Sequence, residues 1–303
     1  MFQLIKVQNQ NNLLDYYQLQ NKEVSCKIYP NLGASLQQFS IQDTEIIQGI
    51  QPVENDLTYF RRYYPSSFLF PFPGRIAGGK YEYEGIEYQL QSNETGRDNA
   101  IHGFIAEVSF QLTEQELDTD VARLNFEYFF QGNEEGFPFP AKINIIYQIS
   151  ADSLKINIII ENTGDKSFPF ALGWHPYFLS QDLTKSKLYF QSKEQLTVDE
   201  YQIPTGTEPI RFTSIIEDQQ LDHTYLLEHS KVQFSTQKYE MGMDTFSTKK
   251  DFLQLYTPPD RASIAIEPMT CTPDVFNNKN GLLELTPNEV YNWSINLDFK
   301  MLA

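Results

Sequence analysis

The chain has 303 residues and a formal net charge of −17, from 40 acidic and 23 basic residues. This charge repels nucleic-acid backbones and anionic membrane surfaces, so we expect neither as a partner. The first residues lack the pattern of a signal peptide, and the apolar runs are too short to span a membrane, which predicts a cytoplasmic protein.

Short alternating or wholly apolar segments recur along the chain and predict β-strands, and an aromatic content of 14% favours strands as well. A turn at Glu84-Gly85 predicts a hairpin within KYEYEGIEYQL, whereas the polar, irregular segment 205–250 predicts long loops. We therefore expect an all-β fold, a large antiparallel β-sandwich in a single domain over 1–303. The expected strands are 24–29, 34–41, 121–130, 143–149, 154–161, 252–256 and 291–299.

Two candidate ligand-binding residues lie in the first half of the chain. PFPGRIAGGKYEY places Arg75 after a tight Pro-Gly turn, where its planar fork of donors suits vicinal hydroxyls or a carboxylate. A salt bridge to one of the many acids is the alternative. DNAIHGF places His102 at the end of a loop, either to bind a hydroxyl group or as a structural loop residue.

A candidate acid lies in SFPFALGWHPYF. Period-2 alternation puts Trp174 on an apolar face and His175 on the opposite face with Ala171 and Gly173, which leave room beside the imidazole. The following proline holds the backbone extended. Trp174 or Tyr177 is expected either to cover an apolar ligand face or to pack in the core.

A candidate base lies in RASIAIEP, where alternation puts Glu267 on the face opposite Ile264 and Ile266. Asp222, followed by His223, precedes a strand in QLDHTYLL and could accept two hydroxyl hydrogen bonds, with an Asx turn as the alternative. An acid and a base in apolar surroundings indicate proton-transfer chemistry.

The only cysteines, Cys26 and Cys271, are expected to be buried reduced thiols, because no CxxC spacing is present. A nucleophilic Cys271 is the less favoured reading, since no neighbouring histidine appears in the sequence. The four histidines show no zinc-protease spacing, and we expect no metal.

Taken together, these motifs resemble the aldose 1-epimerase (mutarotase) family, related to galactose mutarotase, from about residue 20 to the C-terminus. PGRI, IHGF, HPYF, the Asp-His pair and the strand-ending Glu follow the family's order, although PGRI and HPYF depart from its N-R-I and H-x-Y-F-N forms. The resemblance implies a mutarotase-like supersandwich fold and an isomerase without a cofactor. It implies His175 as acid, Glu267 as base, and Arg75, His102 and Asp222 as ligands of the sugar hydroxyls.

The expected activity is exchange of the α and β anomers of a free aldohexose, and the only expected partner is the sugar, bound by a monomer or a homodimer. Three alternatives remain. A hexose-6-phosphate 1-epimerase would need cations at the phosphate, for which Arg61, Arg62 and Arg97 are candidates. A carbohydrate-binding protein need not keep both His175 and Glu267, and a glycosidase would use two carboxylates.

Overall fold

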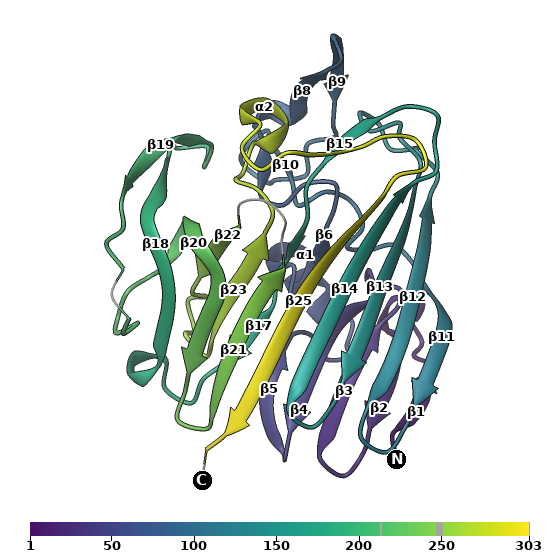
Figure 1. Ribbon diagram of the computed structural model, residues 1–303, viewed down its shortest axis with the longest axis vertical. Helices are drawn as coiled ribbons and strands as arrows, with labels where there is room; N and C mark the ends of the chain where they lie inside the picture. The colour runs from purple at the N-terminus through teal and green to yellow at the C-terminus, as the bar shows by residue number, and fades with distance from the viewer. Residues whose placement is uncertain (213, 247–250, 303) are drawn as a thin grey trace.

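Strands dominate the computed structural model, which describes residues 1–212, 214–246 and 251–302 (Figure 1). Its two α-helices are short: α1 (Asp56–Tyr63) and α2 (Val275–Asn278). No helix among the described residues is long and apolar enough to cross a membrane.

The first layer begins as an antiparallel meander from β1 to β5 and continues through β17, β23 and β22 to β20. The meander is local in sequence, whereas the second half joins segments that are far apart in the chain. The strands are β1 (Gln3–Val7), β2 (Tyr16–Gln20), β3 (Val24–Tyr29), β4 (Ser35–Ile41), β5 (Thr44–Gln48), β17 (Tyr177–Leu179), β23 (Ser263–Met269), β22 (Phe252–Tyr256) and β20 (Asp222–Ser235).

The second layer runs antiparallel from β11 through β12, β13, β14, β25 and β21 to the same strand β20. The start of β20 pairs with β22 and its end with β21, so this strand joins the two layers. At its other side β20 pairs with β18, and β18 with β19. The strands are β11 (Gln111–Leu117), β12 (Ala122–Phe130), β13 (Ala141–Ile149), β14 (Ser153–Asn162), β25 (Val290–Met301), β21 (Tyr239–Phe246), β18 (Lys187–Val198) and β19 (Pro204–Pro209).

Short elements cover one end of the two layers, where α2 and the β8–β9 hairpin project (Figure 1). Most short strands at this end form separate two-stranded pairs: β7 with β10, β8 with β9, and β15 with β24. The strand β16 pairs with both β6 and β23. These strands are β6 (Phe68–Leu69), β7 (Arg75–Ile76), β8 (Lys80–Tyr83), β9 (Ile86–Gln89), β10 (Ala100–Ile101), β15 (Phe168–Phe170), β16 (Gly173–Trp174) and β24 (Leu283–Leu285). The 3₁₀ turns are Ala77–Gly79 between β7 and β8, Asn12–Leu14 between β1 and β2, and Leu183–Lys185 between β17 and β18.

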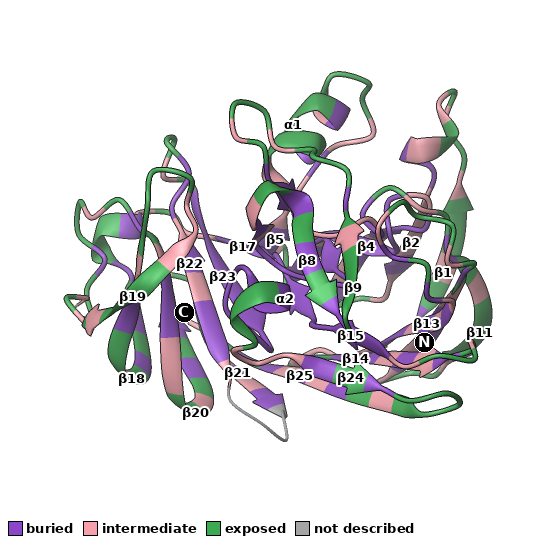
Figure 2. Cartoon of the chain, turned by 90° about the horizontal axis from the view of Figure 1, so that it is seen from above, coloured by how far each residue is buried: buried purple, intermediate pink, exposed green. Residues whose placement is uncertain are grey.

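The core fills the space between the layers, where the buried stretches of the strands gather (Figure 2). Alternation explains its composition: Ile156, Ile158 and Ile160 of β14 face inward with Trp293 and Ile295 of β25. A single layer cannot cover its apolar face, so burial of these side chains holds the two layers together.

All seven expected strands are present within about two residues, and the Glu84-Gly85 hairpin forms as β8 and β9. The prediction of long loops over 205–250 is wrong for most of that segment, because it contains β19, β20 and β21. Many residues of β19 and β20 face solvent at the outer end of the sheet, so the pattern of these two strands carries little apolar signal. Residues 213 and 247–250 lie outside the described residues.

The two segments that carry the candidate acid and base differ from simple alternating strands. Residues 168–179 form three short strands, and Trp174 and Ala171 on opposite faces are both fully buried. All of β23 is buried, and it continues two residues past Glu267, through Pro268. Both segments therefore lie inside the molecule, covered on both faces.

Both cysteines are buried and neither forms a disulfide. Burial raises the pKa of the Cys26 thiol to about 12 and that of Cys271 well above 9.0. These thiols stay protonated near neutral pH, which disfavours a nucleophilic role for Cys271.

Candidate active site

His175 and Glu267 come together from two paired regions of the first layer. Nε2 of His175 lies 3.4 Å from Oε1 of Glu267, and the two side chains are only 8% and 3% exposed. The backbone of His175 is fixed by two hydrogen bonds: its N–H donates to the Ser67 carbonyl (3.0 Å), and its carbonyl accepts from the Ser66 N–H (2.8 Å). The fold thus places an imidazole and a carboxyl side by side at the bottom of a cavity.

Burial moves the pKa values of this pair in opposite directions. Burial, reinforced by Asp222 and opposed by Arg75, raises the pKa of Glu267 well above 4.5. Burial lowers the pKa of His175 to about 4. Both shifts arise because a charge is poorly solvated at this depth. The Nδ1 atom of His175 has no hydrogen-bond partner among the described residues.

The cavity has a volume of about 640 Å³ and is open to solvent at one side. Six of the seven residues singled out from the sequence contribute to its lining, and only Trp174 does not. The six are Arg75, His102, His175, Tyr177, Asp222 and Glu267. The other lining residues are Arg62, Tyr63, Tyr64, Gly74, Ile101, Leu196, Thr197, Val198, Gln202, Glu208, His223, Thr224, Gln254, Tyr256, Pro259, Met269 and Pro273.

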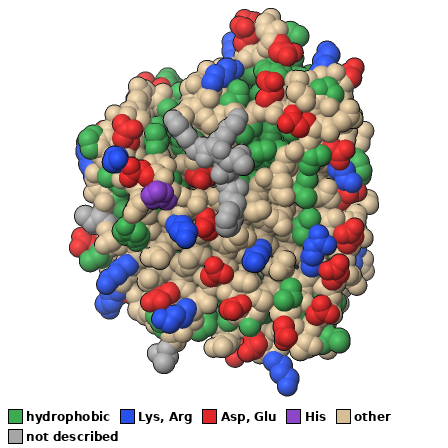
Figure 3. All heavy atoms as spheres, in the orientation of Figure 1, with side chains coloured by type: hydrophobic (Ala, Val, Ile, Leu, Met, Phe, Trp, Pro, Cys, Tyr) green, Lys and Arg blue, Asp and Glu red, His purple; other side chains and the backbone are tan. Residues whose placement is uncertain are grey.

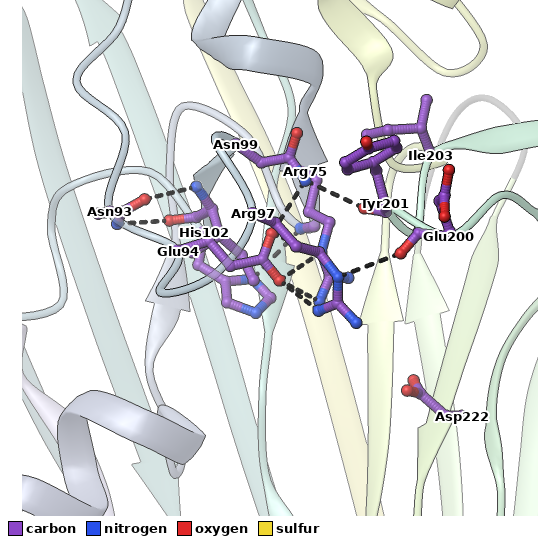
Figure 4. Close-up of polar contacts among 12 residues, drawn as sticks. Arg75, Asn93, Glu94, Arg97, Asn99, His102, Glu200, Tyr201, Ile203 and Asp222 are labelled. Carbon is purple, nitrogen blue, oxygen red and sulfur yellow. Dashed lines mark hydrogen bonds and ion pairs between the residues drawn. The ribbon is translucent and has the colours of Figure 1, made fainter.

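Arg75 is held at the cavity wall by Glu94. Its Nε and Nη2 atoms donate to the Glu94 carboxylate at 2.8–3.1 Å, and Arg97 Nη1 donates to the same carboxylate at 2.9 Å (Figure 4). Burial alone would raise the pKa of Glu94, but the hydrogen bonds from Arg75, Asn99 and Arg97 lower it below 4.5. Of the two possibilities left open for Arg75, the salt bridge is present, and it lies within the cavity lining.

His102 has a defined tautomer. Its Nδ1 accepts a hydrogen bond from the Gly74 N–H at 3.2 Å, so in the neutral ring Nε2 carries the proton. Burial lowers the pKa of His102 well below 6.5, and the neighbouring His175 and Arg75 act in the same direction. His102 is therefore a neutral residue whose remaining ring nitrogen is a hydrogen-bond donor.

Asp222 lies across the cavity from the Arg75 and Arg97 guanidinium groups (Figure 4). It is the first residue of β20 and pairs with Tyr256 of β22, so it starts a strand as expected. Its Oδ1 accepts a hydrogen bond from Gln254 Nε2 at 2.9 Å. Within the described residues its Oδ2 has no hydrogen-bond donor, so this oxygen can accept hydrogen bonds from a ligand.

The two aromatic candidates have different locations. The Tyr177 ring stacks on the His175 ring with centroids 5.2 Å apart, and its hydroxyl donates to the Tyr63 carbonyl at 3.1 Å. Trp174 is fully buried and packs on Phe68 and Phe178. Trp174 therefore does not cover a ligand in the cavity. It packs in the core, which is the other of the two locations expected for it from the sequence.

Sequence reasoning missed several cavity residues. Gln254 could have been noticed as a polar residue between two leucines in the strand FLQLY. Glu94, in the loop SNETGRDN, carries no pattern that marks it as the partner of Arg75. Thr224 and Gln254 became part of the site only when β20 and β22 paired next to β23.

The sequence model of the aldose 1-epimerase family matches residues 15–298. This chain belongs to that family. The uncharacterized protein YihR of Escherichia coli is 27% identical to it over 279 residues, 88% of this chain and 87% of the relative. The maltose epimerase of Levilactobacillus brevis is 26% identical over 200 residues, 63% of this chain and 57% of that protein.

Solved structures share the fold at low sequence identity. A galactose mutarotase-like protein of Clostridium acetobutylicum has a TM-score of 0.88 at 17% identity, covering 100% of this chain and 99% of its own. A galactose 1-epimerase of Lactobacillus acidophilus has a TM-score of 0.81 at 18% identity, again covering 100% and 99%. The expected family, the mutarotase-like all-β fold and the isomerase class are thus confirmed for this aldose 1-epimerase family member.

Proposed function

We propose that this enzyme exchanges the α and β anomers of a free aldose, with Glu267 as base and His175 as acid. The observation that carries the proposal is the 3.4 Å contact between His175 Nε2 and Glu267 Oε1 at the bottom of the cavity. Ring opening removes a proton from the C1 hydroxyl and adds one to the ring oxygen. Both oxygens are bonded to C1, so the two proton carriers must be neighbours.

The reaction then proceeds in balanced steps. Glu267 takes the C1 hydroxyl proton while His175 gives a proton to the ring oxygen, and the C1–O5 bond breaks to leave an aldehyde. Rotation about C1–C2 exposes the other face of the carbonyl. Reclosure returns both protons and yields the opposite anomer, so neither residue is changed over a full cycle.

The opposed pKa shifts suit these roles. Burial makes the Glu267 carboxylate a stronger base and protonated His175 a stronger acid. The reactive state, with ionised Glu267 and protonated His175, holds as many protons as the neutral pair. One proton transfer within the pair therefore reaches it without uptake of a proton from solvent.

The remaining polar residues are proposed to hold the ring hydroxyls. His102 Nε2 and the Arg75 guanidinium are donors, and the free oxygen of Asp222 is an acceptor on the opposite wall. Donors facing an acceptor across a cavity fit a ligand whose hydroxyls both donate and accept. Tyr177 supports the His175 ring by stacking on it.

The same site supports a free sugar over a sugar phosphate. Of the three cations proposed for a phosphate, Arg61 pairs with Glu107 away from the cavity lining, and Arg97 pairs with Glu94. Arg62 lines the cavity, but Glu208 and Asp222 line it too. Acidic and basic side chains are also interspersed on the face shown in Figure 3. The carboxylates of Glu208 and Asp222 in the cavity would repel a phosphate group.

Polarimetry or NMR exchange measurements on freshly dissolved α-D-glucose and α-D-galactose test the proposal. The wild-type enzyme should speed equilibration, and Glu267→Gln and His175→Asn should each lower kcat on the order of 10² to 10⁴-fold. Far-UV circular dichroism establishes that each variant is folded. A near-wild-type rate in either folded variant would reject that residue's role, and no acceleration of any aldose by the wild type would reject the function.

A further inference from the structure

Behind the cavity, His175 and the two serines that hold its backbone each have a buried polar atom without a hydrogen-bond partner among the described residues. These atoms are Nδ1 of His175 and the hydroxyl oxygens of Ser66 and Ser67. Both serines are completely buried, and the His175 side chain is 8% exposed. A buried polar atom without a partner destabilises a fold, so each of these atoms needs a physical reason.

The strand register places Ser67 directly opposite His175. In the antiparallel pair of β6 and β16, Phe68 lies opposite Trp174, and their rings stack with centroids 6.4 Å apart. Opposite residues therefore share a face here, as they do in antiparallel sheets generally. The register continues one step further, since the His175 N–H donates to the Ser67 carbonyl at 3.0 Å. The side chains of Ser67 and His175 thus share the other face.

The Ser67 hydroxyl is within reach of the imidazole. The Cβ atoms of directly opposite residues lie about 4.5–5.5 Å apart, and a serine hydroxyl can turn about χ1 and offer two lone pairs. The outer ring nitrogen, Nε2, faces Glu267 at 3.4 Å. Nδ1, on the backbone side of the ring, is therefore the nitrogen that remains for Ser67.

The proposed reaction requires the neutral imidazole to carry its proton on Nδ1. In the neutral pair the proton is on Glu267, which can pass it to Nε2 only if Nε2 has a free lone pair. The same condition holds after His175 has protonated the ring oxygen, because Nε2 takes that proton back during reclosure. In both states the remaining ring proton is on Nδ1, and this buried N–H needs an acceptor.

The other groups close to the ring are already engaged. Tyr177 stacks on the ring face, and His102 lies edge-on at 5.5 Å between centroids, with its own Nδ1 bonded to the Gly74 N–H. Burial lowers the pKa of His175 and its own backbone opposes this shift, but the His175 carbonyl already accepts the Ser66 N–H at 2.8 Å. The Ser67 hydroxyl has no such engagement among the described residues.

We propose that Ser67 is a positioning residue, whose hydroxyl accepts a hydrogen bond from Nδ1–H of His175 and thereby keeps Nε2 free to exchange a proton with Glu267 and the sugar. This inference rests on the proposed anomer exchange, because it assigns the tautomer that this reaction needs. Ser67 is outside the cavity lining, so it acts on the sugar only through His175.

Nitrogen-15 NMR of untagged, histidine-labelled protein at pH 7 measures the tautomer directly. The ring is neutral there because burial lowers the pKa of His175 to about 4, and His175→Asn identifies its signals among those of the four histidines. In the wild type the proton is expected on Nδ1, and Ser67→Ala should move it wholly or partly to Nε2. A proton on Nε2 in the wild type would overturn the proposal, as would a tautomer that Ser67→Ala leaves unchanged.

Kinetics on glucose and galactose distinguish positioning from general structural support. Ser67→Ala should lower kcat roughly five- to tenfold, the effect of one hydrogen bond, and change KM less than twofold. Ser66→Ala is the matched control: it removes an equally buried hydroxyl without a partner among the described residues, one position earlier, and keeps the backbone N–H. The control should change kcat less than twofold.

The outcomes separate this proposal from the proposed function. Equal losses of kcat in Ser67→Ala and Ser66→Ala, or a loss that appears only in KM, would overturn the role of Ser67 and leave the anomer exchange intact. No acceleration of any aldose by the wild type would overturn the proposed function and with it the role of Ser67 in catalysis. The NMR measurement would still decide whether Ser67 holds the proton on Nδ1.

Discussion

Glu267 shows how one buried side chain connects activity to stability. A carboxyl that is 3% exposed and has a raised pKa binds its proton more tightly in the folded state than in the unfolded chain. Above pH 4.5 the unfolded state therefore releases a proton that the folded state keeps, and the free energy of unfolding falls as the pH rises. The residue proposed as the base makes the protein less stable at the pH where it works.

Glu267→Gln is expected to remove this pH dependence, because the amide does not ionise. The difference in unfolding free energy between variant and wild type should grow in favour of the variant from pH 4.5 upward, by up to about 1.4 kcal/mol per pH unit. Urea unfolding at pH 5, 6, 7 and 8 measures it. His175 acts in the opposite direction between pH 6.5 and about 4, but it is present in both proteins. A difference that does not vary with pH would contradict the assignment.

Glu94 is expected to act on the substrate through Arg75. Glu94→Gln keeps the shape but puts an amide against a guanidinium, which breaks the paired hydrogen bonds. Loss of a charged partner costs about 1.5–3 kcal/mol, so kcat/KM should fall roughly ten- to a hundredfold, mainly through KM. Steady-state kinetics on the preferred aldose measure this.

Glu107→Gln is the matched control, since Glu107 also holds an arginine, Arg61, by two nitrogens. That pair is exposed and outside the cavity lining, so its loss should cost about 1 kcal/mol or less and leave the kinetics unchanged. Equal kinetic effects of the two variants would exclude a specific role for Glu94.

At the scale of elements, the loop of His102 depends on a close approach of two backbones. His102 and Gly103 both have positive φ, 61° and 65°. A Cβ on Gly103 would lie 2.0 Å from the carbonyl oxygen of Phe70, which also accepts the Phe104 N–H. Only glycine fits there, and this contact fixes where the imidazole of His102 enters the cavity.

Gly103→Ala should therefore displace the loop, lowering the free energy of unfolding by about 3 kcal/mol or more and reducing kcat/KM. Gly85→Ala separates steric contact from backbone strain, because Gly85 also has positive φ (75°) but nothing lies within 4 Å of a Cβ there. Its cost should be about 1–2 kcal/mol, with unchanged kinetics. Denaturant unfolding and kinetics on both variants make the comparison, and similar losses would show that crowding at Phe70 is unimportant.

At the scale of the whole molecule, the net charge of −17 acts on any charged substrate. A phosphorylated aldose is repelled by this field and by the carboxylates of the cavity, whereas a neutral sugar is not. Glucose should thus have a higher kcat/KM than glucose 6-phosphate. The ratio should shrink as ionic strength rises from about 0.01 to 0.15 M, because the Debye length falls from about 30 to about 8 Å. A preference for the phosphate at low salt would instead support the sugar-phosphate alternative.

Local patterns in the sequence predicted much of the fold, and the ordered motifs identified Arg75, His102, His175, Asp222 and Glu267, which all line the cavity. The alternation in LKINIIIE and the turn at Glu84-Gly85 depend on neighbouring residues alone, so β14 and the β8–β9 hairpin could be recognised without knowledge of any partner. The His175 and Glu267 motifs were recognisable for the same reason. The weakly patterned outer strand β19 could not be recognised in this way.

Only the tertiary structure decided which residues face one another. Glu94 became the partner of Arg75, and Gln254 and Thr224 came into line with Glu267, through contacts between segments that are far apart in the chain. Trp174 became a core residue because both faces of its segment are covered. A strand's period-2 pattern says which side chains share a face, but strand order and register depend on the packing of the whole sheet. The sequence alone therefore determined the chemistry of the two side chains proposed as proton carriers, and the pairing of distant strands determined the shape of the cavity around them.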